Sequence, residues 1–234
     1  MARPGDGLTT LDRVFAEAYR LRLMRGLEES LHDAGYGQVA GVDEAGRGSL
    51  AGPVVAAAVL VQPGVLVPGV DDSKHLKAPA REAIEGLVRS AHPVHAVVAV
   101  SPQEIDRVNI LEATRIAMRR AVERLARRPE IVLVDAVRLE LDSPSLPVIR
   151  GDQVSYAIAC ASILAKVARD REMERLDGVY PQYGFASNKG YGAPAHRAAL
   201  AEHGPCDEHR LTFRSVLPRT DAATPRRAGS SAWR

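Results

Sequence analysis

A short segment near the start of the chain constrains its fold more than any other feature, because two adjacent carboxylates follow an apolar run and precede a glycine loop. Neighbouring side chains of a strand point to opposite faces of the sheet, so Asp43 and Glu44 can serve one site only where their strand ends and the backbone twists. Gly46 and Gly48 give the backbone that freedom, and Arg47 between them adds a planar cation. The segment predicts a strand that ends beside a metal ion and a phosphate group.

Taken alone, an Asp-Glu pair before a glycine turn is usually a plain acidic strand end, because short motifs recur by chance. Further acids favour the metal interpretation. The β-branched and aliphatic run 131–134 predicts a buried strand that presents Asp135 at its carboxyl-terminal tip, where ligands of open α/β sheets bind. Asp152 precedes the alanine-rich run 153–174, so the sequence places it at the N-cap of a helix, a position that by itself requires no chemistry.

Four carboxylates at the ends of three elements cannot all stay ionised together without cations. Hard divalent ions prefer oxygen ligands, and two such ions can clamp the attacking and leaving oxygens of a phosphodiester. Magnesium or manganese fits an all-oxygen site, whereas zinc would require histidine or cysteine ligands. The histidines have no ligand spacing, and His196 is interpreted as a surface residue.

The motifs and their order resemble the ribonuclease HII family, the type 2 ribonucleases H that nick the RNA portion of RNA/DNA duplexes. The resemblance covers roughly residues 39 to 216 and rests on the segments Gly41–Gly48, Ala51–Val55, Asp72–Lys74, Asn109–Thr114, Val134–Asp135, Gly151–Asp152, Ala159–Asp170 and Lys189–Gly192. Three residues depart from the usual pattern: His75, Arg150 and Ala136, the last where glycine is common after Asp135. None of these departures removes a carboxylate, but Ala136 puts the shape of the loop after Asp135 in question.

The resemblance implies a role for each motif. The metal ligands and catalytic residues would be Asp43, Glu44, Asp135 and Asp152. The 2′-hydroxyl and the backbone of the scissile ribonucleotide would be recognised by Gly46, Arg47 and Gly48, and Tyr191 would stack on the neighbouring deoxyribose at an RNA-to-DNA junction. Lys74 and Lys189 are candidate phosphate contacts, although most lysines are solvated surface residues.

The expected reaction is phosphodiester hydrolysis assisted by two divalent ions, Mg²⁺ or Mn²⁺, with products that carry 5′-phosphate and 3′-hydroxyl ends. The expected substrate is an RNA/DNA hybrid or a DNA duplex with a single ribonucleotide, cut on the 5′ side of that ribonucleotide. Three alternatives remain open at this point. A DNA exonuclease or junction resolvase would not depend on a 2′-hydroxyl, a phosphatase would act on small molecules, and a non-catalytic hybrid-binding module would have to tolerate four acids facing phosphates.

The chain of 234 residues, 46% of them hydrophobic, is long enough for one substantial core, which favours an α/β domain with a helical appendage. The resemblance specifies a ribonuclease H-like mixed five-stranded sheet flanked by helices, with a C-terminal helical extension. We expect a disordered lead over residues 1–10, the catalytic domain over 11–216 and a disordered basic tail over 217–234. The net charge of only +2 does not by itself indicate a nucleic-acid partner.

Local patterns supply the remaining expectations. Apolar residues at helical spacing, including Phe15, Tyr19 and Leu23, predict one helix from residue 11 to residue 31. The arginine-rich run 115–128 is interpreted as a solvated helix face rather than a duplex contact. No stretch has the length of a membrane span or the apolar core of a signal peptide, so we expect a cytoplasmic location. A monomer is expected because no coiled-coil heptads are present, and no replication or repair partner can be assigned.

Overall fold

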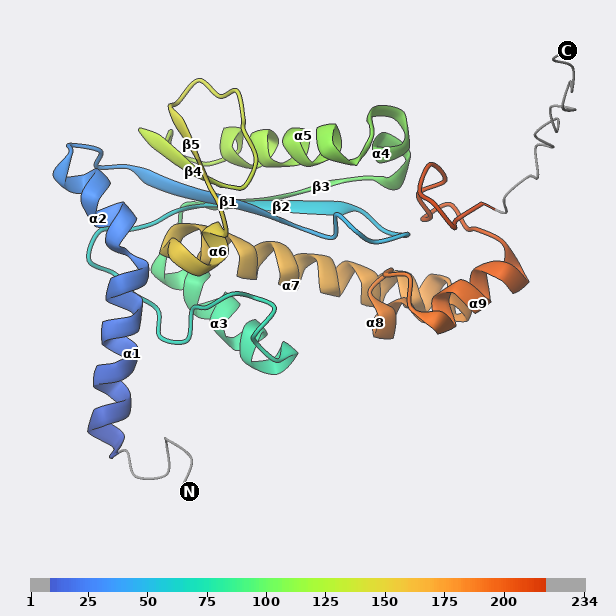
Figure 1. Cartoon of the computed structure of the whole chain (residues 1–234), viewed down its shortest axis with the longest axis horizontal. Helices are drawn as coiled ribbons and strands as arrows, with labels where there is room; N and C mark the ends of the chain where they lie inside the picture. Colours follow the sequence, from blue (N-terminus) through green and yellow to red (C-terminus); the bar gives the residue numbers. More distant parts are fainter. Residues whose placement is uncertain (1–8, 218–234) are drawn as a thin grey trace, which may run out of the picture.

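The computed structural model describes residues 9–217, and its centre is a mixed five-stranded sheet (Figure 1). The strands are β1 (Val39–Ala45), β2 (Val54–Leu60), β3 (His95–Val100), β4 (Ile131–Asp135) and β5 (Ser145–Val148). Their order across the sheet is β3-β2-β1-β4-β5. β2 is antiparallel to both β1 and β3, whereas β4 is parallel to both β1 and β5. The α/β class and the mixed five-stranded sheet are therefore confirmed.

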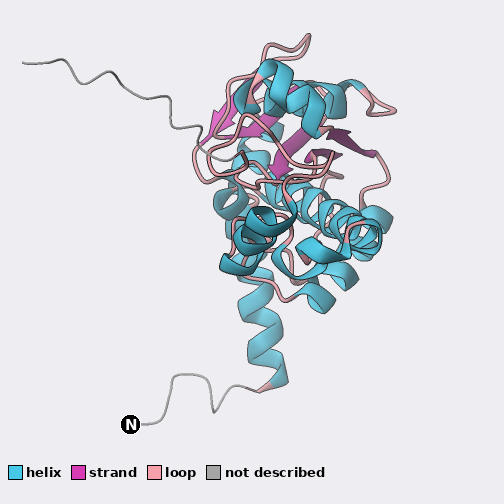
Figure 2. Ribbon diagram, turned by 90° about the vertical axis from the view of Figure 1, so that its right-hand side faces the viewer, coloured by secondary structure: helices cyan, strands magenta, loops and turns pink. Residues whose placement is uncertain are grey.

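Helices cover both faces of the sheet (Figures 1 and 2). They are α1 (Thr10–Met24), α2 (Gly26–Asp33), α3 (Ala78–Ala91), α4 (Pro102–Val108), α5 (Ile110–Glu123), α6 (Gly151–Val154), α7 (Tyr156–Val179), α8 (Phe185–Asn188) and α9 (Pro194–His203), with a 3₁₀ turn over Pro181–Tyr183. α4 and α5 lie on one face and α3 and α7 on the other, while α8 and α9 continue beyond the sheet at the far end of α7. The helix α9 begins at a proline, and Asn109 separates α4 from α5.

The alternation of side chains along the strands divides the core into two layers. Val42 and Val134 pack toward α5, where Met118 is fully buried. Ala57 and Val59 pack toward α7, where Ile163 and Leu164 are fully buried, and the helix α3 closes the outer side of this layer. The sheet is thus covered on both faces, which leaves the ends of its strands as the place for a site.

The central strand approaches α7 so closely that only glycine fits at one position. A Cβ atom on Gly41 would lie 2.2 Å from the carbonyl carbon of Ala157 and 2.4 Å from the backbone nitrogen of Ile158. Because α7 begins at Tyr156, Gly41 fixes the start of this helix directly against β1. The first turns of α7 are therefore held next to the strand that carries Asp43 and Glu44.

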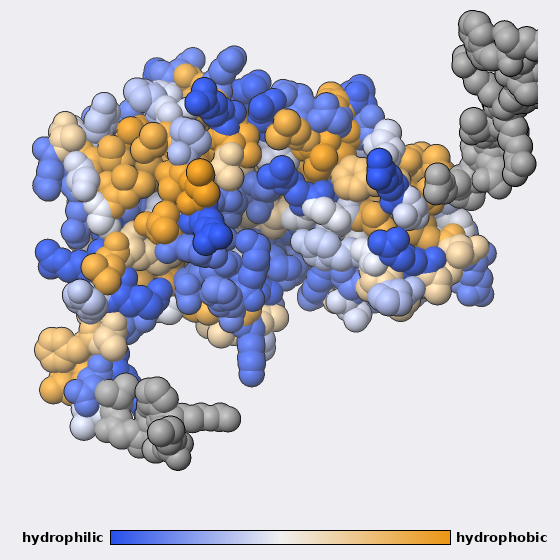
Figure 3. Space-filling view, in the orientation of Figure 1, coloured by the Kyte–Doolittle hydropathy of each residue, from blue (hydrophilic) through white to orange (hydrophobic). Residues whose placement is uncertain are grey.

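The predicted single helix over residues 11–31 is wrong in two respects. It is broken at Arg25, whose buried side chain turns away to donate hydrogen bonds to the carbonyls of Gln62 and Val65. The expected apolar face is also exposed, since Phe15 and Tyr19 are 66% and 67% accessible. α1 projects from the body, so most of its length has no core to face (Figures 2 and 3).

Most of the expected terminal segments lie outside the described residues. The helix α1 begins at Thr10, capped by Thr9, and the remainder of the predicted disordered lead is not covered. The predicted tail is covered only at Leu217. Within residues 9–217, no helix has both the length and the apolar character that a membrane span requires.

We predict that Gly41→Ala lowers the free energy of unfolding by about 3 kcal/mol, because the added methyl group meets backbone atoms that cannot move aside. Gly178→Ala, in the helix α7 that Gly41 contacts, is the control, since a Cβ there meets nothing within 4 Å. The control should leave stability unchanged or raise it by up to about 1 kcal/mol. Chemical denaturation measures both, and equal stabilities of the two variants would contradict the close contact.

Candidate metal and nucleic-acid site

The parallel pairing of β1 with β4 places two acids side by side. Val42 pairs with Val134 in this register, so the next residues, Asp43 and Asp135, lie side by side at the same edge of the sheet. Asp43 is 4% exposed. The Asp135 carboxylate accepts a hydrogen bond of 2.7 Å from the backbone of Gly151, which ties the start of α6 to the same edge. The predicted delivery of Asp135 at a strand tip is confirmed.

Glu44 joins this pair although the strand does not end at Asp43 as expected. β1 continues to Ala45 along its antiparallel partner β2, whereas β4 ends at Asp135. The Glu44 side chain, only 10% exposed, therefore lies beside the end of β4. One carboxylate oxygen each from Asp43, Glu44 and Asp135 lie within 4.8 Å of one another.

The three acids repel one another in a buried setting. Burial raises the pKa of Asp43 well above its usual range, and the charges of Glu44 and Asp135 raise this pKa further. Burial also raises the pKa of Glu44, with Arg47 acting in the opposite direction. The pKa of Asp135 is raised by burial, and the charge of Asp152 adds to the shift while the Gly151 hydrogen bond opposes it. An added cation at this point would remove the repulsion.

The donor set fits a hard divalent cation. All three groups are carboxylates, and the Oε2 atom of Glu44 is buried with no hydrogen-bond partner among the described residues. Arg47 donates only to the other oxygen, Oε1, at 3.2 Å. A buried carboxylate oxygen without a partner is costly, and coordination of a metal ion would satisfy it.

Asp152 is not the helix cap that the sequence indicated. It lies inside the short helix α6, whose N-cap is Arg150 in a left-handed conformation, and the N-cap of α7 is Ser155, whose side chain accepts from the backbone of Ile158. The break at Ser155 separates α6 from α7, which the uniform alanine-rich composition did not reveal. Asp152 is 5% exposed and forms an ion pair of 2.9 Å with Lys74. It stands outside the group of three acids.

The glycine loop and the Tyr191 loop are adjacent in space. Gly46 has a φ of +91°, which favours glycine, and an ideal Cβ on Gly48 would lie 4.0 Å from the Tyr191 ring. The backbone N–H of Leu50 donates to the carbonyl of Gly190 at 2.8 Å, which joins the two loops. Tyr191 is 43% exposed, as expected for a ring that faces outward.

The two candidate lysines are placed differently. Lys74 extends from the loop before α3 to Asp152, and its side chain is 74% exposed. Lys189 adopts a left-handed conformation with a φ of +51°, and its ammonium pairs with Glu174 at 2.7 Å. Lys74 therefore lies beside the acids, and Lys189 lies on the side of the Tyr191 loop.

Four buried residues near these loops were not predicted to support the site. Arg169 and Arg210 donate to the backbone carbonyls of both loops. His196 is fully buried, which corrects its interpretation as a surface residue, and it contacts the Tyr191 carbonyl at 2.8 Å and His209 at 3.0 Å. Their burial depends on the packing of α9 and the segment after it against α7 and α8, which no local pattern encodes.

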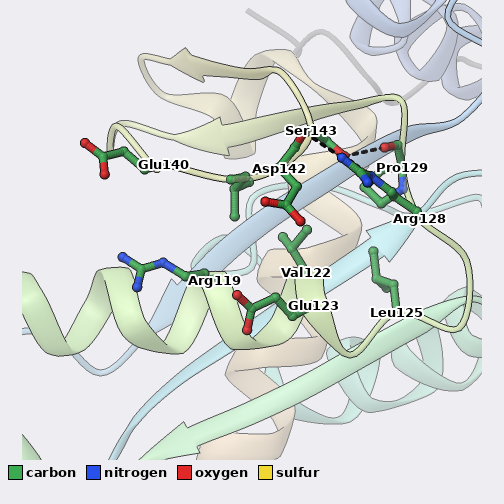
Figure 4. A pocket seen from close by; sticks show the side chains of 10 residues that line it. Arg119, Val122, Glu123, Leu125, Arg128, Pro129, Glu140, Asp142 and Ser143 are labelled. Carbon is green, nitrogen blue, oxygen red and sulfur yellow. Dashed lines mark hydrogen bonds between the residues drawn. The ribbon is translucent and has the colours of Figure 1, made fainter.

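A separate cavity of about 570 Å³ lies between the end of α5 and the loop that joins β4 to β5 (Figure 4). None of the site acids lines it, and its charged residues are of both signs: Arg119, Arg128, Glu123, Glu140 and Asp142. Nearby arginines are bound within the protein, since Arg120 pairs with Glu104 and Arg128 donates to the carbonyl of Asp142. This pairing supports the interpretation of the arginine-rich run as a solvated face.

Comparison with known proteins assigns a family to this arrangement. A family model described as Ribonuclease HII matches residues 40–216. The Ribonuclease HII of Syntrophotalea carbinolica is 49% identical over 190 residues, which cover 81% of this chain and 91% of the relative. The crystal structure of ribonuclease H2 from Pyrococcus horikoshii superposes with a TM-score of 0.69 at 28% identity, over 76% of this chain and 95% of that chain. The RNase HII of Archaeoglobus fulgidus, solved in complex with PCNA, gives a TM-score of 0.66 at 29% identity, with the same coverage.

We predict that Asp43→Asn raises the thermal midpoint of the metal-free protein and abolishes its rise with Mn²⁺. Because the folded-state pKa of Asp43 is raised, its ionised form costs stability at pH values above that pKa, and the neutral amide removes this cost. Wild type should gain about 2.7 kcal/mol when Mn²⁺ is present at a hundred times its dissociation constant. Thermal denaturation with and without the ion measures both effects. Asp142→Asn, at an exposed acid, is the control; an equal Mn²⁺ response in Asp43→Asn and wild type would refute the ligand assignment.

Proposed function

The chain belongs to the ribonuclease HII family, metal-dependent endonucleases that act on RNA/DNA hybrids, and from this premise we propose that it also cuts on the 5′ side of a single ribonucleotide embedded in duplex DNA. The observation that carries the proposal is the contact between the loop that follows the acids and the loop of Tyr191. A 2′-hydroxyl is the only group that distinguishes RNA from DNA at one nucleotide. A glycine loop lets backbone groups approach that hydroxyl, and an exposed ring beside the loop can stack on the next sugar.

In this proposal the acids position divalent cations at the scissile phosphate. Asp43, Glu44 and Asp135 would hold one ion through the carboxylate oxygens that lie close together. Asp152 would be a ligand of a second ion. When bound, the two ions lower the pKa of the attacking water and stabilise charge on the leaving 3′-oxygen, which gives 5′-phosphate and 3′-hydroxyl ends. Magnesium and manganese both suit this oxygen donor set.

The remaining residues of the site would bind the nucleic acid. Gly46, Arg47 and Gly48 would contact the ribonucleotide, and Arg47 is suited to this because its side chain is 44% exposed while it is anchored on Glu44. Tyr191 would stack on the deoxyribose at the junction. Lys74 and Lys189 would contact phosphates on either side of the acids. Each ammonium group could exchange its present carboxylate partner for a phosphate oxygen, because both are anionic hydrogen-bond acceptors.

The alternatives considered from the sequence are less well supported. A non-catalytic hybrid-binding module would have no use for three acids that repel one another and for a buried oxygen without a partner. A small-molecule phosphatase would have no use for an exposed tyrosine beside the glycine loop. The relative from Archaeoglobus was solved with PCNA, but no contact among the described residues of this chain assigns it such a partner. The cytoplasmic location and the monomeric state remain predictions from the sequence.

We predict that one ribonucleotide in a DNA duplex is sufficient for cleavage on its 5′ side. The test compares matched duplexes of one sequence that contain zero, one or several ribonucleotides, with Mn²⁺ or Mg²⁺ present, and maps the product ends. The all-DNA duplex should stay intact because the glycine loop then has no 2′-hydroxyl to bind. Nicking of that duplex at the same rate as the duplex with one ribonucleotide would favour a DNA nuclease instead.

We also predict that Asp152→Asn lowers single-turnover cleavage by about a hundredfold or more, while the thermal midpoint changes little. The structure gives Asp152 no capping role, and its partner Lys74, whose side chain is 74% exposed, stays solvated when the ion pair is lost. A lost contact to a catalytic ion is worth several kcal/mol in the transition state. Part of the loss should be recovered at high Mn²⁺ concentration. Wild-type cleavage by this variant would leave only three acids in the site, and Asp142→Asn controls for the loss of a charge.

A further inference from the structure

Two arginines near the site are buried without a carboxylate partner among residues 9–217. Arg169 of α7 is 1% exposed and Arg210 is fully buried. Within the described residues, all six hydrogen bonds of their side chains go to backbone carbonyls. A buried charge is costly unless it is well hydrogen-bonded, so this arrangement is expensive to maintain and calls for an explanation beyond packing.

Arg210 sets the orientation of the glycine loop. Its guanidinium donates to the carbonyls of Gly46 at 2.8 Å and Arg47 at 2.9 Å, and its Nε atom donates to Gly52 at 3.0 Å. The C=O and N–H of a trans peptide point in opposite directions. With the two loop carbonyls turned toward Arg210, the N–H groups of Arg47 and Gly48 point away from it, and neither donates to another described residue. These are the groups that a 2′-hydroxyl or phosphate would contact.

Arg169 connects the same loop to Tyr191. Its Nη1 atom donates to the carbonyl of Lys189 at 2.8 Å, and its guanidinium carbon lies 5.6 Å from the centre of the Tyr191 ring. On the other side, a Cβ on Gly46 would lie 1.9 Å from Nε of Arg169. Arg169 therefore fills the space between the two loops, and only a glycine at position 46 leaves room for it.

We propose that Arg169 and Arg210 are positioning residues that hold the Gly46–Gly48 loop and Tyr191 at a fixed separation, and that selectivity for a single embedded ribonucleotide depends on them. The inference rests on the proposed function of these two loops. A duplex with a single ribonucleotide can be bound in one position only. In that position the glycine loop must contact the 2′-hydroxyl while Tyr191 contacts the adjoining deoxyribose. A continuous hybrid offers a 2′-hydroxyl at every step and does not require the junction contact.

The two charges also suit the substrate. Burial lowers the pKa of Arg210 to about 9, and the neighbouring charge of Arg169 contributes to the shift, so Arg210 remains protonated at neutral pH. A phosphate bound on the other side of the loop would offset the repulsion between the two guanidinium groups. The planar fork that reaches two carbonyls at once is specific to arginine, whereas lysine keeps the charge and loses the fork.

The test uses Arg210→Lys and Arg169→Lys, with matched controls at exposed arginines close by in the chain, Arg214→Lys and Arg171→Lys. Single-turnover cleavage is measured on two duplexes of one sequence, one with a single ribonucleotide and one with a continuous RNA strand. We expect each buried-arginine variant to lose about tenfold to a hundredfold more rate on the single-ribonucleotide duplex than on the hybrid. The controls should keep the wild-type ratio of the two rates.

A double-mutant cycle with Tyr191→Ala distinguishes positioning from a general structural effect. If Arg169 acts through Tyr191, Arg169→Lys should change the ratio of the two rates little once the ring is absent. Equal losses on both substrates, or losses that multiply in the double mutant, would overturn the proposal. If the lysine variants do not fold, Phe213→Leu removes the ring 5.1 Å from the Arg210 guanidinium while its hydrogen bonds remain, and it should shift the ratio in the same direction. An unchanged ratio in Phe213→Leu would then overturn the role of Arg210.

The wild-type enzyme separates this outcome from the proposed function. Failure of the wild type to cut the single-ribonucleotide duplex would refute the proposed function, and the positioning role would fall with it. Normal cutting by the wild type with unchanged ratios in folded lysine variants would refute the positioning role alone.

Discussion

The parallel register between β1 and β4 is the constraint on which the site depends. Because Val42 pairs with Val134, the next residue on each strand is an aspartate at the same edge of the sheet. β4 then ends while β1 continues along β2, so Glu44 meets an open edge. A shift of this register by one residue would turn one aspartate to the other face of the sheet. The contact of Gly41 with the start of α7 keeps β1 in place behind this edge.

The site combines charges of both signs that are only partly paired among the described residues. Three acids lie together on the metal side, and two arginines lie under the adjoining loop without a carboxylate bond among the described residues. Each group is costly in the free protein, because like charges repel and burial disfavours charge. A phosphodiester with its cations would relieve both, because the cations would neutralise the acids and the negative phosphate would offset the charge of the arginines. Binding would thus be most favourable when the metal ions and the nucleic acid are both present.

Much of this site could be predicted from the sequence, because the strands that carry Asp43 and Asp135 are short apolar runs whose pattern is local. The break at Asn109 was also local, since its side chain caps the following helix. Ala136, which stands where glycine is common in the family, has a φ of +49°, a backbone conformation that favours glycine. The sequence therefore indicated correctly that the loop after Asp135 is a position of unusual backbone geometry. Asp152 and the helix over residues 11–31 were misjudged because the breaks at Ser155 and Arg25 follow from contacts with other segments. The burial of Arg169, Arg210 and His196 depends on the packing of segments far apart in sequence, which composition does not encode.

The hydrogen bonds of the buried histidines His196 and His209, which lie near Tyr191, can run in one direction only. The Tyr191 carbonyl can only accept, so Nδ1 of His196 carries a proton, and the backbone N–H of Cys206 can only donate, so Nδ1 of His209 does not. The bond of 3.0 Å between the two rings must then run from His209 to His196. Burial and the charge of His196 lower the pKa of His209 to about 4, and burial lowers the pKa of His196 as well. The Tyr191 loop is therefore held by a chain of hydrogen bonds that runs from Cys206 through His209 and His196 to the Tyr191 carbonyl. Protonation of Nε2 of His196 would place two N–H donors opposite each other between the rings and break this chain.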